Sequence, residues 1–253
     1  KIHGLNRSDL ILLAARPGVG KSSFAMNIAL NVAKQSGTTV AVFSLEMSKE
    51  QLLVRLMAAE GLVELTRLAT GRLSASDWGK LTQAARTLRQ SDIRIDDNPM
   101  LTAADINAKC RRLDNLGLVV IDYLQLMTSA GGKGYAGENR QQAVSDISRM
   151  LKVMAKELNV PVICLSQLSR ANEKREDKRP MLSDLRDSGA IEQDADIVMF
   201  LYREDYYKED TESKNIAECI VAKNRHGETG KVPLRWSPEY TTFSTIEMRF
   251  DED

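Results

Sequence analysis

The sequence contains few of the residues that build metal centres and disulfide frameworks. Among its 253 residues there are only two histidines and three cysteines. Cys110, Cys164 and Cys219 lie far apart and form no CxxC pair, which excludes a zinc-finger spacing and a disulfide-stapled secreted domain. The sequence therefore predicts reduced thiols, a cytoplasmic location and no metal site that depends on imidazole or thiolate ligands.

Long apolar runs are also absent, and so is an excess of charge of one sign. No stretch approaches the roughly 18–20 apolar residues of a membrane-spanning helix, so no membrane partner is expected. The first apolar stretch, 10–15, runs directly into a glycine-containing loop and does not read as a signal peptide. Lys and Arg total 35, as do Asp and Glu, which gives a net charge of zero. Any contact with a nucleic acid must therefore come from local groups and not from a general positive field.

Short apolar segments alternate with longer amphipathic ones, a pattern typical of an α/β domain with a mostly parallel sheet flanked by helices. We expect a single domain over 1–253. The strands are predicted at 10–15, 39–44, 93–96, 118–122, 160–166 and 196–202, and β-hairpins from residue 216 onward. The helices are predicted at 21–34, 48–60, 62–69, 75–90, 102–113 and 140–158. The glycine-rich segment 128–139 and the charged run 173–179 are expected to be loops, the second of them a solvated one.

The segment ARPGVGKS, residues 15–22, lies between the first strand and the first helix. Its glycines allow backbone N–H groups to surround phosphate oxygens, and the helix N-terminus adds partial positive charge. The pattern approximates GxxxxGK[ST], with Ala15 in place of the first glycine, and predicts an ATP site in which Lys21 neutralises phosphate charge. The residues expected to hold the nucleotide are Arg16, Pro17, Gly18, Val19, Gly20, Lys21, Ser22 and Ser23.

Two carboxylates lie at or just after the ends of predicted strands, on the side of the sheet where the phosphate loop is expected. Asp122 follows the apolar run LVVI and is expected to bind Mg²⁺ together with Ser22. Glu46 follows the strand 39–44, which is expected beside the first strand, so its carboxylate would face the γ-phosphate. A carboxylate at that place orients or deprotonates the attacking water.

Taken together, these stretches resemble the RecA-like motor domain of the DnaB-type replicative helicases. The matching segments are AARPGVGKSSFAMNIA (14–29), FSLEMSKEQLLVRL (43–56), VVIDYLQLM (119–127), ENRQQAVSDISRMLK (138–152), VPVICLSQLSR (160–170), KRPMLSDLRDSGAIEQDADIVMFLYRED (178–205) and AKNRHGETG (222–230). They cover most of the chain in the order of the family. Ala15 in place of the first glycine is normal for that family.

The resemblance implies roles that spacing alone does not give. It implies a homo-hexamer with the nucleotide between neighbouring subunits, where Lys223 and Arg225 reach into the site of the next subunit. It implies that Gln167 senses the γ-phosphate and that Arg55 lies near the active site. For single-stranded DNA it implies contacts from Arg186, Asp187 and Gly189 in a loop at 179–189, and a second loop at 131–140 in which Lys133 and Arg140 supply charge.

The resemblance further implies ATP-driven 5′→3′ movement on single-stranded DNA, with a primase and a helicase loader as partners. An N-terminal domain and linker of such a helicase are expected to be missing from this chain. Two other functions stay open at this point: a RecA-type recombinase ATPase, and a slowly hydrolysing loader or switch module. The segments SLEMS (44–48) and IEQDAD (191–196) favour the helicase over the recombinase. The presence of Glu46 together with Lys223 and Arg225 argues against a switch.

Overall fold

A nine-stranded sheet forms the centre of the molecule. The computed structural model describes residues 1–122, 138–208 and 210–246. Strands run in the order β3-β2-β4-β5-β1-β6-β7-β8-β9, the pairs from β3 to β6 parallel and the pairs from β6 to β9 antiparallel. Their bounds are β1 Leu10–Ala15, β2 Thr39–Ser44, β3 Ile93–Asp96, β4 Leu116–Asp122, β5 Val162–Gln167, β6 Ile197–Arg203, β7 Ile216–Asn224, β8 Gly230–Ser237 and β9 Thr242–Thr245. The predicted parallel sheet with added C-terminal hairpins is thus observed.

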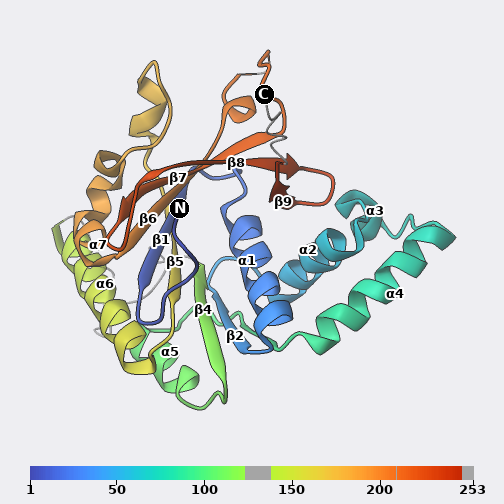
Figure 1. Cartoon of the computed structure of the whole chain (residues 1–253), viewed down its shortest axis with the longest axis horizontal. Helices are drawn as coiled ribbons and strands as arrows, with labels where there is room; N and C mark the ends of the chain where they lie inside the picture. Colours follow the sequence, from blue (N-terminus) through green and yellow to red (C-terminus); the bar gives the residue numbers. More distant parts are fainter. Residues whose placement is uncertain (123–137, 209, 247–253) are drawn as a thin grey trace, which may run out of the picture.

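Helices cover both faces of this sheet, α1 to α4 on one side and α5 to α7 on the other (Figure 1). Their bounds are α1 Lys21–Ser36, α2 Lys49–Gly61, α3 Leu65–Thr70, α4 Ala75–Gln90, α5 Ala103–Cys110, α6 Glu138–Leu158 and α7 Gly189–Asp194. Among the residues that the structure describes, no helix is both long and apolar enough to cross a membrane.

Alternate residues of the central strands pack into two separate cores. Leu10 and Leu12 of β1 lie in the cluster beneath α5 and α6, whereas Ile11 and Leu13 lie in the cluster beneath α1 and α2. All four are fully buried, as expected for a strand in the middle of a parallel sheet with helices on both faces. This burial makes β1 a rigid support for the loop that follows it.

Local signals determine where several helices begin and end. Ser48 and Gln51 form the predicted capping box at the start of α2, with the Ser48 hydroxyl accepting from the Gln51 N–H at 3.3 Å. Gly37 has φ of 61° and ends α1, a left-handed conformation that glycine adopts at little cost. The predicted end of the helix at 102–113 is wrong, because α5 stops at Cys110 and the chain turns there through i→i+3 bonds such as Leu113 N–H to Cys110 O.

The predicted loop at 179–189 is also wrong over most of its length. Residues Leu182–Ser188 form a 3₁₀ helix, η3, which leads directly into α7. Leu185 and Ile191 are buried in the core beneath α6, so apolar packing draws this polar-looking segment into helical turns.

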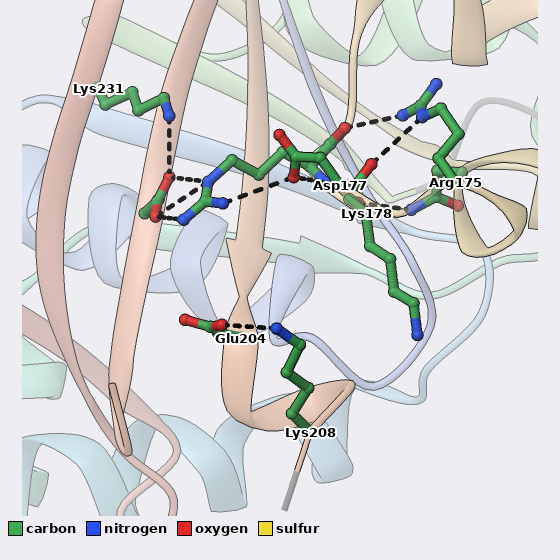
Figure 2. Close-up of polar contacts among 9 residues, drawn as sticks. Arg175, Asp177, Lys178, Glu204, Lys208 and Lys231 are labelled. Atoms are coloured by element: carbon green, nitrogen blue, oxygen red, sulfur yellow. Dashed lines mark hydrogen bonds and ion pairs between the residues drawn. The ribbon is translucent and has the colours of Figure 1, made fainter. Parts of the chain in front are cut away.

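The charged run 173–179 stays partly exposed, as predicted, but two of its arginines are held by ion pairs. Arg175 donates two hydrogen bonds of 2.8 Å to the carboxylate of Asp184, which is buried in η3. Arg179 pairs with both carboxylate oxygens of Glu218 on β7, at 2.9 and 2.6 Å, and stacks over the ring of Tyr202. Figure 2 shows Arg175, Asp177 and Lys178 of this run with their polar contacts. The pairs with Asp184 and Glu218 attach the run to η3 and to the sheet. Bidentate arginine–carboxylate pairs have a fixed geometry, so they hold the run in place against η3 and β7.

The three thiols are expected to be unreactive in the folded protein. Cys110, Cys164 and Cys219 are all buried, and burial raises the pKa of each thiol to about 12. Because the thiolate is the reactive form, a chromogenic disulfide reagent at pH 8 should modify none of them within minutes. The same assay in guanidinium chloride should release three equivalents. Rapid modification of the native protein at any thiol would contradict the burial of that cysteine.

Candidate active site

The predicted phosphate loop lies between β1 and α1. Gly18 and Gly20 adopt φ values of 79° and 110°, a region that other residues seldom occupy. Gly20 directly precedes α1, whose first turn has no acidic residue and no side-chain cap. A Cβ atom on Gly20 would come within 2.8 Å of the ring of Phe243, so the position also lacks room for a side chain. The loop therefore has the backbone conformation and the helix terminus that phosphate oxygens require.

Asp122 ends β4 beside the loop, as predicted. Its Oδ1 lies 3.6 Å from the Lys21 ammonium, and the side chains are only 5% and 11% exposed. The same Oδ1 is buried without a hydrogen-bond donor among the described residues. Burying a carboxylate oxygen without a donor is costly unless a cation compensates it. Asp122 together with the Ser22 hydroxyl of the loop is thus chemically suited to an oxygen-preferring divalent cation such as Mg²⁺.

Glu46 follows β2 and is exposed on the same edge of the sheet. Leu45 N–H donates to the Asp122 carbonyl at 2.6 Å, which fixes the segment after β2 against the end of β4. The carboxyl ends of the adjacent parallel strands β2, β4, β5 and β1 meet at this edge, the usual place for a ligand in an open α/β sheet.

A cavity of about 330 Å³ brings most of the predicted catalytic residues together. The phosphate loop lines this cavity together with Glu46, Arg55 and Gln167. Gln167 is the last residue of β5 and pairs in register with Ala15, immediately before the loop. Arg55 reaches the cavity from α2, where it is half-buried. Their individual roles remain predictions; the structure shows that all three line the same cavity as the phosphate loop.

Arg16 differs from the other loop residues because its guanidinium is already engaged within the protein. It donates to the Leu168 carbonyl at 2.7 Å and to the Glu173 carboxylate at 2.8 Å, and the residue is only 8% exposed. These bonds tie the phosphate loop to the segment that follows Gln167. The prediction that Arg16 binds the nucleotide thus rests on its backbone and its place in the loop.

Several cavity residues were not anticipated from the sequence, among them two from the C-terminal hairpin. Trp236 at the end of β8 and Thr241 just before β9 line the cavity next to the loop. Both come from the C-terminal hairpin, far from the nucleotide motifs along the chain. No sequence pattern marks them, because their position depends on how the hairpin folds back over α1.

Lys223 pairs with Val198 near the start of β6, and Arg225 directly follows β7. Both residues therefore lie away from the carboxyl ends of the parallel strands. The Lys223 ammonium donates to the Glu192 carbonyl at 2.6 Å, and Arg225 donates to the Gln193 carbonyl at 2.6 Å. Burial lowers the pKa of Lys223, and the neighbouring charge of Arg225 lowers it further. Neither residue lines the cavity of its own chain.

The separation between Arg225 and its own phosphate loop follows from the strand pairing. Arg225 N–H donates to the Asp196 carbonyl, and Asp196 N–H donates to the carbonyl of Leu10, the first residue of β1. The loop starts after Ala15, at the other end of that strand. At about 3.3 Å per residue, the length of β1 alone places Arg225 about 17 Å from the phosphate loop. Arg225 therefore cannot complete the phosphate site of its own chain in this conformation.

The side chains of the residues predicted to contact DNA lie outside the described part of the structure. Lys133 falls among residues 123–137, which are not described. Arg140 lies on α6, while Arg186, Asp187 and Gly189 lie at the junction of η3 and α7, but their side chains are outside the described residues. These DNA contacts stay predictions.

The chain matches a described protein family and several known proteins over nearly its whole length. Residues 1–245 match the family described as "DnaB-like helicase C terminal domain". The chain is 58% identical over 252 residues to "Replicative DNA helicase DnaB" of Geobacillus stearothermophilus and 56% identical over 252 residues to "Replicative DNA helicase DnaC" of Bacillus subtilis (strain 168). Each match covers 98% of this chain and 55% of the relative, so the chain spans about half the length of these relatives.

Two solved structures share the fold. One, described as an ATPase domain, superposes with a TM-score of 0.91 at 43% identity, covering 97% of this chain and 87% of the other. A second structure, "The Structure Of A DnaB-Like Replicative Helicase And Its Interactions With Primase", gives the same TM-score and identity and covers 97% of this chain and 59% of the other. The RecA-like α/β fold predicted from the sequence is confirmed by this agreement.

Proposed function

This chain belongs to the DnaB-like helicase C-terminal domain family, and we propose that it is the ATP-hydrolysing motor of a hexameric replicative DNA helicase. The observation that carries the proposal is the cavity in which the phosphate loop faces Glu46, Arg55 and Gln167. A pure nucleotide switch has no need for a carboxylate and a polar strand-end residue on the γ-phosphate side. A single domain over 1–253 acts as the motor, with further domains elsewhere in the full protein.

The residues of one chain can bind ATP and orient water for attack. Backbone amides of the loop hold the phosphates, and the Lys21 ammonium offsets their charge. Glu46 orients the attacking water and accepts its proton. Gln167 ends β5, and the next residue, Leu168, accepts a hydrogen bond from Arg16, which also pairs with Glu173. Through these contacts a movement of Gln167 on loss of the γ-phosphate reaches the run 173–179. The charged run 173–179 then links this point to η3 by the Arg175–Asp184 pair.

Mg²⁺ would be held by Asp122 and Ser22 and would screen the negative charge of the phosphates. The buried, donor-free Oδ1 of Asp122 fits a cation or a cation-bound water at that position. Lys21, 3.6 Å away, shares the compensation of this carboxylate.

The proposed hexamer accounts for the position of Lys223 and Arg225. Since β1 separates Arg225 from the phosphate loop of its own chain by about 17 Å and neither residue lines the cavity of that chain, both serve the site of a neighbouring subunit in a head-to-tail ring. Such an arrangement makes each ATP site depend on two chains. An arginine supplied in trans stabilises the charge that develops on the transferring phosphoryl group.

The proposed substrate and partners follow from family membership. We propose that single-stranded DNA passes through the ring and contacts the 131–140 and 179–189 segments, with movement in the 5′→3′ direction, as the resemblance to this family implies. Contacts of this kind engage the phosphate chain and not the bases, so binding is sequence-independent and salt-sensitive. A related DnaB-like helicase is described with primase, which supports primase as a partner; a helicase loader is a further proposed partner, and the buried thiols suit the reducing cytoplasm.

The specific ATPase rate, measured against protein concentration with and without a single-stranded oligonucleotide, tests the proposal. We expect the rate per subunit to rise with concentration, because each site is completed by a neighbour, and to rise again with DNA. Size-exclusion chromatography on the same samples reports whether the rise coincides with assembly. A low rate that neither assembly nor DNA changes would favour a switch or loader module instead.

A further inference from the structure

The turn between β7 and β8 carries Arg225 and has no apolar side chain to hold it. Residues 225–229 are all exposed, and none of them is hydrophobic. A turn of this kind fluctuates unless polar contacts fix it. Such motion matters for Arg225, because an arginine stabilises a transferring phosphoryl group only when its guanidinium is in place. The contacts that hold this turn therefore bear on the reaction.

His226, the residue after Arg225, is joined to the start of the central strand β1. Its Nε2 lies 2.9 Å from Oδ1 of Asp9. Asp9 directly precedes β1 and is 4% exposed, whereas the His226 side chain is 48% exposed. An ionised carboxylate only accepts hydrogen bonds, so the imidazole donates through Nε2–H. The pair thus connects the exposed turn to the buried centre of the fold.

Asp9 offers the imidazole a fixed partner. Its carbonyl accepts from the Val162 N–H of β5 at 2.9 Å, and its second carboxylate oxygen accepts from the Asn6 amide at 3.2 Å. The strand that follows Asp9 is fully buried between β5 and β6 in the sheet. A buried carboxylate whose oxygens are both engaged is rigid, so its bond to His226 restrains the turn and not the reverse.

The other side-chain contacts of the turn do less to attach it to the sheet. The pair of Lys1 with Glu228 is 3.5 Å long, and the Glu228 side chain is 85% exposed, so this pair contributes little. Asn224 accepts from the His226 N–H and donates to the Glu228 carbonyl. These two bonds lie within the turn and shape it, but they do not connect it to another part of the chain.

Arg225 keeps one contact with its own chain when its side chain turns toward a neighbour. The guanidinium donates to the Gln193 carbonyl at 2.6 Å and lies 3.7 Å from the Asp196 carboxylate, and both contacts must then be released. The Arg225 N–H still donates to the Asp196 carbonyl at 2.9 Å. This bond attaches one residue of the turn, and the bond of His226 to Asp9 attaches the next. Two adjacent attachments fix the direction of the turn, whereas one alone lets it pivot.

We propose that His226 and Asp9 are positioning residues that hold the β7–β8 turn so that Arg225 is presented to the phosphate site of a neighbouring subunit. They contact neither the nucleotide nor the attacking water, and they act through the placement of Arg225. This inference rests on the proposed function, since it presumes that Arg225 acts in trans.

Removing the imidazole is expected to slow hydrolysis without weakening nucleotide binding. His226→Ala should lower kcat of DNA-stimulated ATP hydrolysis by about 10-fold, the effect of one lost hydrogen bond to a charged group on the fraction of correctly held turns. KM for ATP should stay nearly unchanged, because the phosphate loop of each chain is intact. His226→Gln, whose side-chain amide can donate to Asp9, should recover most of the rate. The other histidine, His3, is exposed, and His3→Asn is the matched control.

Mixed assemblies show whether the loss lies in the site of the neighbour. Lys21→Ala has a defective phosphate loop but an intact turn, so it can supply Arg225 to a His226→Ala chain. Excess Lys21→Ala is therefore expected to raise the rate per His226→Ala chain. The double variant Lys21→Ala/His226→Ala, added in the same excess, should not raise it. A mere loss of stability in His226→Ala would respond equally to both additions, and thermal melting measures that stability separately.

The results distinguish this inference from the proposed function. Wild-type kcat in His226→Ala, or equal rates with the two added variants, would overturn the role of His226 while Arg225→Ala remains impaired. The same holds if Lys21→Ala rescues Arg225→Ala but not His226→Ala. If Arg225→Ala itself hydrolysed ATP at the wild-type rate, or if Lys21→Ala rescued neither variant, the trans arginine would fail and this inference with it.

Discussion

Replacing Glu46 with glutamine is expected to lower the rate of ATP hydrolysis by about 10²–10⁴-fold, the usual contribution of a general base, while leaving nucleotide binding nearly unchanged. Glutamine has the same shape as glutamate but accepts no proton and orients water less strongly. Glu46 lines the cavity but is not part of the phosphate loop, so we expect the change to act on the attacking water and not on the phosphate contacts. Single-turnover hydrolysis of ATP and equilibrium binding of ADP measure the two quantities separately.

The matched control for this variant is Glu50→Gln. Glu50 is exposed in the first turn of α2, four residues along the chain, and does not line the nucleotide cavity. We expect Glu50→Gln to hydrolyse ATP at close to the wild-type rate. If Glu46→Gln retained more than about a tenth of the wild-type rate, the loss would be smaller than a general base usually contributes. Another group would then have to orient the water.

Most of the central sheet was predictable because its strands are short apolar runs bounded by polar residues. The strands predicted at 39–44 and 93–96 coincide with β2 and β3. Burial along the whole of β2 explains its apolar run, whereas β3 lies at the edge of the sheet and carries the charged residues Arg94 and Asp96. The segment 182–194 was not predictable in the same way. Its helical turns depend on the burial of Leu185 and Ile191 and on the Arg175–Asp184 pair, all of which are tertiary contacts.

The part of the site that the sequence could predict lies immediately after strands. Lys21, Glu46, Asp122 and Gln167 follow or end β1, β2, β4 and β5, which are adjacent and parallel, so their carboxyl ends converge regardless of the detailed packing. Thr241, by contrast, reaches the cavity through three antiparallel strands and a strained turn. Neither composition nor spacing encodes that path, because it depends on the register of each hairpin.

Arg225→Ala is expected to lower DNA-stimulated ATP hydrolysis by about 10³–10⁵-fold, equivalent to about 4–7 kcal/mol of transition-state stabilisation. The magnitude is that of an arginine supplied to a transferring phosphoryl group by a neighbour. ADP binding should change little, because the charge that this arginine stabilises develops only during the reaction. Arg225→Lys keeps the charge but loses the planar fork and should recover only part of the activity. Steady-state ATPase assays on assembled protein measure these effects.

Stability must be measured beside activity, because Arg225 also has contacts in its own chain. It pairs with Asp196 at 3.7 Å and donates to the Gln193 carbonyl. Asp196 keeps Lys152 and the Leu10 N–H as partners when Arg225 is removed, so the fold should survive with a modest loss of thermal stability. Arg235→Ala on exposed β8 is the matched control for loss of a surface arginine and should retain activity.

Mixing two inactive variants distinguishes a trans arginine from one that acts in its own chain. Arg225→Ala keeps an intact phosphate loop, and Lys21→Ala keeps an intact Arg225. If β1 separates these groups within a chain, as the strand pairing requires, then a mixed assembly contains interfaces in which a good loop meets a good arginine. The mixture should therefore hydrolyse ATP faster than either variant alone at the same total concentration. A mixture whose rate is no higher than the average of the two variants would contradict the trans arginine, because each chain would then have to supply both groups to its own site. That would require β7 to move by a large distance relative to β1.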